Sequence, residues 1–281
     1  MMDTAAYCER LVREQDPDRY FTALFAPAEK RPHLFALYAF NAEIAGVAER
    51  VSEPTPGEIR LAWWREVLEG QRNEEAGAHP VASAIRATIA SHNLPVNAFV
   101  RMVEARVIDL YDDPIPTVND LEGYAGDTSS ALIRLASIVL AGGRDPGGAE
   151  AAGHAGVAYA ITGLLRVLPF QAQQGQVLVP TEILARNGAR RDDILAGRAT
   201  PQVLTALAAM RALARDHLQA ARTYRPDASV AAAFLPVAIA AQYLKRMERS
   251  GYQPFRTPVE LPQWRRLSAL WLAARKGRPM G

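Results

Sequence analysis

Residues 34–51, LFALYAFNAEIAGVAERV, are the stretch that decides the fold class of this chain. Its large apolar residues recur mostly three or four positions apart, at Leu34, Leu37, Tyr38, Ile44, Val47 and Val51. This spacing places them on one face of an α-helix, because a helix completes a turn in about 3.6 residues. The stretch therefore predicts an amphipathic helix with one buried side.

The same period continues along most of the chain. A second apolar face is formed by Leu61, Trp64, Val67 and Leu68, and further helices are predicted around residues 81–91, 98–110, 128–140, 155–168, 203–224 and 230–249. Strand-like alternation is almost absent, and alanine, the best helix former, is abundant. Proline and glycine fall between the helical segments, with no long linker and no internal repeat. We expect an all-α protein with one helical domain over residues 1–281.

Composition and motifs exclude several classes of protein. Hydrophobic residues make up 49% and charged residues 22%, as in ordinary soluble domains. The five histidines form no pair at metal-ligand spacing, so we predict no zinc site, and Cys8 alone cannot form an internal disulfide. Basic residues are not interleaved with aromatic ones, which argues against nucleic acid.

The sequence pattern also predicts no signal peptide and no membrane-spanning segment. The N-terminal residues carry charge throughout and have no apolar core of a signal peptide. The longest apolar stretch, residues 230–244, is shorter than the roughly 20 residues that a membrane span needs. We expect a cytoplasmic protein.

Three segments, taken in order, carry a family resemblance. The first is the opening stretch with LAWWREVL at 61–68, the second is LEGYAGDTSSA at 121–131, and the third is YAITGLLRVLPF at 159–170, running into GQVLVP at 175–180. In order and spacing they resemble the squalene/phytoene synthase family over about residues 20–247. The resemblance implies a helical bundle of the isoprenoid (terpenoid) synthase type, whose active members join two prenyl diphosphates head to head.

The resemblance also implies where active members bind magnesium through a first aspartate-rich motif. A diphosphate leaving group needs Mg²⁺ to neutralise its charge, and carboxylates on one helical face hold that ion. At the positions of the DDxxD motif this chain has Ala45, Gly46 and, as the one carboxylate, Glu49. The first motif is therefore predicted to be degenerate.

The second motif is predicted to be degenerate as well. Where active members carry an asparagine, an Arg-Asp pair and further acids, this chain has Gly163, Arg166, Val167 and Gln171, with no acid. Pro169 is expected to end or kink the helix at this point. Because both sides of the ion site are affected, we predict no metal, no magnesium cofactor and no catalytic residue.

Tyr38, Glu49 and Arg166 are the candidates for a cavity or a ligand site. Tyr38 belongs to an apolar helical stripe, for which core packing is the simpler interpretation. Arg166 lies in an otherwise apolar stretch, and a buried arginine needs a partner. We expect a salt bridge to a carboxylate such as Glu49, and the alternative is an anionic ligand.

Within the family, the same degenerate pattern resembles the branch that includes the mitochondrial complex I assembly factor. Those members share the Leu-Leu-Arg, proline and glycine order that stands here at residues 164–166, 169 and 175. The resemblance implies a pseudoenzyme that acts by binding a protein partner in respiratory complex assembly. Two alternatives stay open: an active Mg-dependent prenyltransferase of isoprenoid biosynthesis, and an isoprenoid or lipid carrier that uses the old cavity.

The C-terminal end is basic, in contrast to the rest of the chain. Residues 245–281 hold nine Lys or Arg against two Glu, a net charge of +7 within a total of +2. The segment 258–278 predicts a basic amphipathic helix with apolar Trp264, Leu267, Leu270 and Trp271 on one side, flanked by Arg265, Arg266 and Lys276. Such a helix suits peripheral contact with the inner face of an anionic cytoplasmic membrane. The simpler alternative is a terminal helix docked on the bundle.

Overall fold

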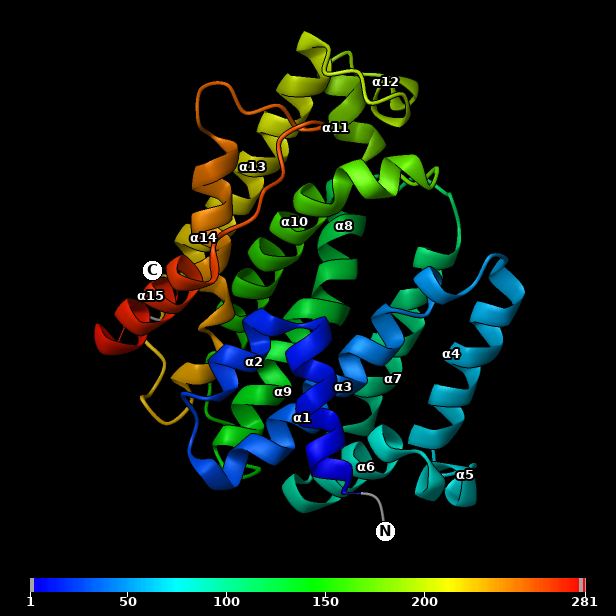
Figure 1. Ribbon diagram of the computed structural model, residues 1–281, viewed down its shortest axis with the longest axis vertical. Coiled ribbons are helices and arrows are strands. Elements are labelled where there is room, and N and C mark those ends of the chain that lie inside the picture. The colour runs from blue at the N-terminus through cyan, green and yellow to red at the C-terminus, as the bar shows by residue number, and fades with distance from the viewer. Residues whose placement is uncertain (1–2, 278–279, 281) are drawn as a thin grey trace.

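Helix α10 (Ala149–Gln173) runs through the middle of the bundle in the computed structural model, which describes residues 3–277 and 280 (Figure 1). It packs most extensively against α13 (Pro201–Ala221) and also contacts α14 (Pro236–Met247) and α9 (Ala131–Leu140). The N-terminal helices α1 (Thr4–Gln15) and α3 (Arg31–Ala45), drawn in blue, lie against each other.

The described residues contain no strand, so the all-α prediction is confirmed. The remaining helices are α2 (Pro17–Ala23), α4 (Pro54–Leu68), α5 (Asn73–Ala78), α6 (Pro80–His92), α7 (Val96–Ala105), α8 (Val118–Ala125), α11 (Thr181–Arg186), α12 (Arg191–Leu195) and α15 (Gln263–Arg275). Short 3-10 turns occupy Ala28–Lys30, Ala48–Arg50 (η2), Arg106–Leu110 (η3) and Ala231–Ala233, and a π-turn occupies Gly126–Ser130 (η4).

Helix starts follow local chemistry. Proline stands in the first turn of α2, α4, α6, α13 and α14, where its missing N–H costs nothing because that group has no partner inside the helix. At the start of α8, the Thr117 hydroxyl accepts a bond from the Asp120 N–H, and the Asp120 carboxylate accepts one from the Thr117 N–H. This reciprocal capping box fixes where α8 begins.

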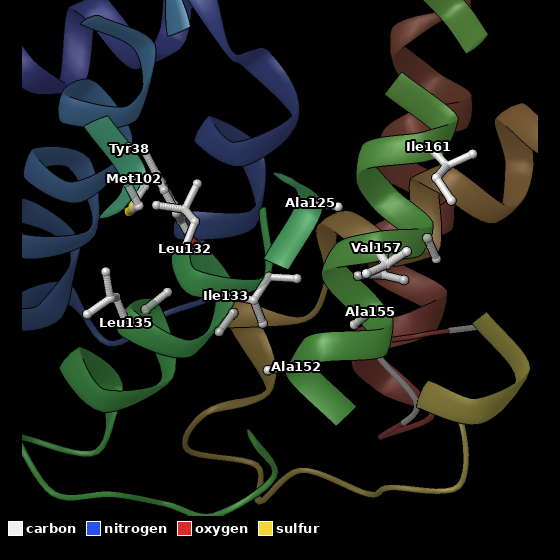
Figure 2. Packing of buried hydrophobic residues seen from close by; sticks show 14 of the residues in the cluster. Tyr38, Met102, Ala125, Leu132, Ile133, Leu135, Ala152, Ala155, Val157 and Ile161 are labelled. Carbon is white, nitrogen blue, oxygen red and sulfur yellow. The ribbon is translucent and has the colours of Figure 1, made fainter. Parts of the chain in front are cut away.

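One apolar core cluster includes residues from α1 through α15. Figure 2 shows Leu132 and Ile133 of α9 between Tyr38 and Met102 on one side and the face of α10 with Val157 and Ile161 on the other. Gly156 marks the closest approach of α10 to η4, because a Cβ added there would lie 2.3 Å from the Ser130 backbone.

One sequence prediction about a helix end is corrected, and of the two outcomes predicted at Pro169, an end or a kink of the helix, the end is corrected. The helix of the opening stretch ends at Ala45, and Glu49 lies in the separate turn η2, so Val47 and Val51 do not continue the helical stripe. Helix α10 does not end at Pro169 but continues to Gln173. A proline removes one backbone N–H, and here that loss falls in the last turns of a long packed helix.

Helix α10 is also the one described helix that is long and apolar enough, by length and composition, to cross a membrane. Its most apolar window is 56% buried inside the bundle. A core helix passes the same test, so this feature is explained by the burial of α10.

Candidate functional site

A cavity of about 650 Å³ lies between the C-terminal end of α3, the middle of α10, η3 and the junction of α1 with α2. Ala45, Gly46 and Glu49 line it from the α3 side. Gly163, Arg166 and Val167 line it from α10. The fold thus brings the two predicted motif positions, more than a hundred residues apart in the sequence, to opposite walls of one cavity.

Two of the predicted site residues lie elsewhere. Gln171 is not part of the cavity lining, and its side-chain oxygen is buried without a hydrogen-bond partner in the described chain. Tyr38 is 2% exposed, belongs to the core and does not line the cavity, and the guanidinium of Arg19 lies 5.9 Å from the centre of its ring. Tyr38 therefore supports Arg19 and does not face a ligand.

Arg19 is a buried cation on the cavity wall. It pairs with Asp16 at 2.5 Å and stacks over the Tyr159 ring at 4.6 Å. Burial alone lowers the pKa of Arg19, but Tyr159 and Asp16 outweigh it and hold the pKa above its ordinary value. Asp16 also accepts the Arg19 N–H at the start of α2, so its carboxylate is already engaged twice.

Arg106 forms a second, partly buried unit with Asp109 and Tyr124. Arg106 donates to the Tyr124 hydroxyl at 2.7 Å and pairs with Asp109 at 3.2 Å, while that hydroxyl donates to Asp109 at 2.9 Å. Burial raises the pKa of Asp109, and the Arg106 guanidinium offsets part of that rise. The sequence analysis did not identify Arg106 and Asp109 as site residues. Their opposite charges, three residues apart in an apolar helical segment, are a signal from which this pair could have been predicted.

The salt bridge expected for Arg166 is not present in the described structure. No ion pair within the described residues includes Arg166, and its guanidinium lies 3.8 Å from the centre of the Tyr243 ring. A cation over an aromatic face is stabilised by the ring quadrupole, so Tyr243 takes the place of the expected carboxylate. The Nε of Arg166 is buried without a hydrogen-bond partner among the described atoms.

Glu49, the remaining candidate partner, also stays outside every ion pair of the described chain, because Arg50 next to it pairs with Glu43 at 2.7 Å. The carboxylates that line the described cavity are therefore Asp16 and Glu49, beside Arg19, Arg50, Arg106 and Arg166. No group of three or more His, Cys, Asp or Glu side chains in residues 3–277 is arranged to hold a metal ion.

A magnesium–diphosphate cluster does not fit this donor set. Mg²⁺ in such sites is held by carboxylates together with phosphate oxygens. Here Asp16 is bound to Arg19, and Glu49 is a single unpaired carboxylate among guanidinium groups. The fork of N–H groups of an arginine matches phosphate and carboxylate oxygens, and Arg166 is the cavity arginine without a carboxylate partner among the described residues.

The predicted C-terminal helix forms as α15 (Gln263–Arg275), shorter than the segment 258–278, of which residue 278 lies outside the described residues. Leu270 and Ala273 are buried against the bundle, whereas Trp264 and Trp271 are 64% and 51% exposed. Leu270 therefore does not share the tryptophan side. The surface positions predicted for Arg265 and Lys276 agree with their exposure, but Arg266 turns inward and pairs with the buried Asp18 at 2.9 Å.

The helical bundle with its cavity between α3 and α10 has the fold of the isoprenoid synthase type, as two solved structures show. The structure of a dehydrosqualene synthase matches with a TM-score of 0.81 at 18% identity, covering 97% of this chain and 95% of that one. The structure of the squalene synthase HpnC from Alicyclobacillus acidocaldarius matches with a TM-score of 0.69 at 23% identity, covering 98% and 94%. These likenesses show the fold.

Sequence comparison then gives the family: the chain belongs to the squalene/phytoene synthase family, whose pattern matches residues 12–267. It is 31% identical over 260 residues to "NADH dehydrogenase (ubiquinone) complex I, assembly factor 6" of Rattus norvegicus, covering 92% of this chain and 78% of the relative. The Homo sapiens protein of that name is also 31% identical, over 259 residues with the same coverage. The phytoene synthase of Thermus thermophilus is 27% identical, covering 97% and 94%. The resemblance read from the sequence is confirmed.

Proposed function

We propose that this protein is a non-catalytic member of its family that acts by binding and takes part in the assembly of respiratory complex I. The observation that carries the proposal is the chemistry of the cavity wall. Both motif positions face the same space, but they contribute one carboxylate, Glu49, and one guanidinium, Arg166. A wall of this kind favours an anion and disfavours Mg²⁺.

The chemical argument concerns the leaving group. Ionising a prenyl diphosphate places negative charge on the departing phosphates, and metal ions neutralise it in a water-poor site. The arginines of this cavity are engaged: Arg19 with Asp16, Arg50 with Glu43 and Arg106 with Asp109. Such paired groups are held in place by the fold, and they leave the site without the ion cluster that the reaction uses.

The part in respiratory complex assembly is supported by sequence similarity. The two relatives named complex I assembly factor 6 exceed the phytoene synthase in identity over most of this chain. We propose an interaction with a protein partner, and an isoprenoid or another anionic amphiphile as the ligand of the cavity. The proposed location is the cytoplasm, at the inner face of the cytoplasmic membrane.

The first experiment measures diphosphate release from farnesyl and geranylgeranyl diphosphate, with and without Mg²⁺. The Thermus thermophilus phytoene synthase, assayed in parallel, is the active control. We expect no turnover above background from the folded protein at any magnesium concentration. Magnesium-dependent turnover would instead establish the second candidate, an active prenyltransferase, which the 27% identity to that synthase over nearly the whole of both chains favours.

The second experiment separates binding roles. Deleting the gene in the source organism is expected to lower the amount of assembled complex I on native gels, and the wild-type gene should restore it. Unchanged complex I would remove the assembly role. Tight binding of a farnesyl lipid without turnover, combined with normal complex I, would establish the carrier hypothesis instead.

A further inference from the structure

A groove separate from the cavity lies between α14 and α15. The two helices run antiparallel side by side: residues 245–249 lie near residue 265, and Ala238 lies near Ala273 (Figure 1). One end of the groove has a volume of about 240 Å³ and is lined by Lys245, Arg246, Arg249 and Arg265. We call the whole depression the α14–α15 groove.

The four cations at this end are uncompensated. None of them takes part in an ion pair within residues 3–277. Glu248, on the same helix, is engaged with Arg215 at 2.8 Å. No carboxylate lines the described part of the groove, so its basic end favours an external anion.

The other end of the groove is apolar. It has a volume of about 280 Å³ and is walled by Ala238, Ala241, Leu272 and Ala273, with Arg222 and Lys276 as its charged residues. Gln242, Ala269 and Leu272 line both ends, so the two compartments are continuous. A continuous site with a basic end and an apolar end matches an amphiphile that carries an anionic headgroup.

A third feature indicates where this amphiphile comes from. Trp264, Leu267 and Trp271 are exposed and stand three and four residues apart, so they share one face of α15 beside the groove. Arg265 and Arg275 stack over Trp264 and Trp271 at 5.0 and 5.1 Å. Tryptophan rings with adjacent cations are favoured at the boundary between lipid headgroups and acyl chains.

We propose that the α14–α15 groove binds an anionic phospholipid at a membrane surface. The phosphate lies at the basic end among Lys245, Arg249 and Arg265, and the first part of an acyl chain lies along the alanine-walled end. The exposed tryptophans sit in the headgroup region around that lipid. The chemistry differs from that of the cavity. This inference shares the membrane location with the proposed function, but it does not depend on the role in complex I assembly or on the absence of catalysis.

The main test compares full-length variants in vesicle flotation. We expect the wild-type protein to bind vesicles of phosphatidylcholine mixed with phosphatidylglycerol, and not pure phosphatidylcholine. The variant Lys245→Gln/Arg249→Gln should bind about 25-fold more weakly, from about a fivefold loss for each basic residue near an anionic surface. The matched control is Arg60→Gln/Arg65→Gln on α4, which removes the same charge from exposed arginines that have no ion pair in the described structure.

A second measurement tests the site itself with a water-soluble probe, a short-chain phosphatidylglycerol, by calorimetry. We expect saturable binding that is much weaker for glycerol 3-phosphate, which lacks the chain. Ala269→Phe fills the middle of the groove without a change of charge and should weaken probe binding at least tenfold, with thermal unfolding as the check on folding.

Three results would overturn the proposal. Equal loss of vesicle binding in the α4 control would mean that total charge alone is responsible. Equal binding of glycerol 3-phosphate would mean that the site recognises the phosphate alone and not a lipid. An absence of flotation with anionic vesicles would mean that the groove does not bind a membrane lipid and would favour a protein partner.

Discussion

The cavity and the basic end of the α14–α15 groove each hold four basic side chains, but the two sites differ in how these charges are compensated. In the cavity, Arg19, Arg50 and Arg106 each face a carboxylate of the same chain, and Arg166 lies on an aromatic ring. In the groove, none of the lysines and arginines has an acidic partner in the described residues.

The difference follows from burial. Arg19 lies inside the bundle and loses its water, so the fold must supply partners, and these partners become part of its stability. Arg106 is partly buried and follows the same rule, whereas the pair of Arg50 with Glu43 is exposed. A charge on an open groove keeps its water and needs none. The compensated cations of the cavity are therefore part of the folded structure, whereas the groove cations have no acidic partner among the described residues.

The largest expected effect comes from breaking a cavity pair. Asp109→Ala leaves the partly buried Arg106 without its carboxylate and is expected to lower the free energy of unfolding by about 2–3 kcal/mol in urea titrations, less than for a fully buried pair because both side chains keep some contact with solvent. The double variant Arg106→Leu/Asp109→Leu removes both charges and should regain most of that loss. A single-variant loss below about 1 kcal/mol would show that the cavity charges are not structural.

Packing along α10 is expected to give the next effect, with opposite signs at two glycines: Gly156, which meets Ser130, and Gly163, which lines the cavity. Gly156→Ala meets the Ser130 backbone and is expected to destabilise by about 1–3 kcal/mol. Gly163→Ala has open space, with no atom within 4 Å, and should stabilise the helix by up to about 1 kcal/mol. Thermal and urea unfolding of the two variants measure these changes in the free energy of unfolding. A change of the same sign in both variants would contradict the described packing.

Removing groove charge should hardly affect folding. Lys245→Gln/Arg249→Gln is expected to change the free energy of unfolding by less than about 0.5 kcal/mol, because exposed cations without partners contribute little. Added salt should weaken vesicle binding by wild-type protein, since exposed charges are screened over about 10 Å at 0.1 M. A large change in the free energy of unfolding would show that Lys245 and Arg249 contribute to folding stability, as the cavity arginines are expected to do.

Acidification is expected to give the smallest effect, and it acts on the bundle. Burial lowers the pKa of His33, His79 and His92 below the usual value of 6.5. On acidification through that value the unfolded chain takes up protons before the native one, so stability is present at higher pH and declines as the pH falls. Unfolding midpoints measured across this range should fall towards lower pH, and a rise would contradict the assigned burial.

The helical fold was largely accessible from the sequence because its signal is local. The stripe of Leu61, Trp64, Val67 and Leu68 is buried in α4 as the spacing predicts. Helix ends were less accessible: Gly46 closes α3 before Glu49, and Pro169 is tolerated inside α10 by packing that the local pattern does not reveal.

The candidate site was predictable in part. Family resemblance pointed to Gly163 and Arg166, and both line the cavity together with Ala45 and Glu49. The partner of Arg166 could not be predicted, because Tyr243 lies 77 residues further along the chain and reaches it only through the packing of α14 on α10. Arg266 was placed outside for the same reason, since its partner Asp18 is at the other end of the sequence.

The division of α15 between the bundle and solvent has an evolutionary consequence. The face of α15 towards the bundle carries Arg266, Leu270 and Ala273, and the face towards solvent carries Trp264 and Trp271. Deleting one residue in the middle of this helix would rotate everything after it by about 100°. Trp271 would then turn towards the bundle, and a residue that is now buried would turn towards solvent. Point substitutions can therefore change one face of α15 at a time, whereas a small insertion or deletion within the helix changes both faces at once.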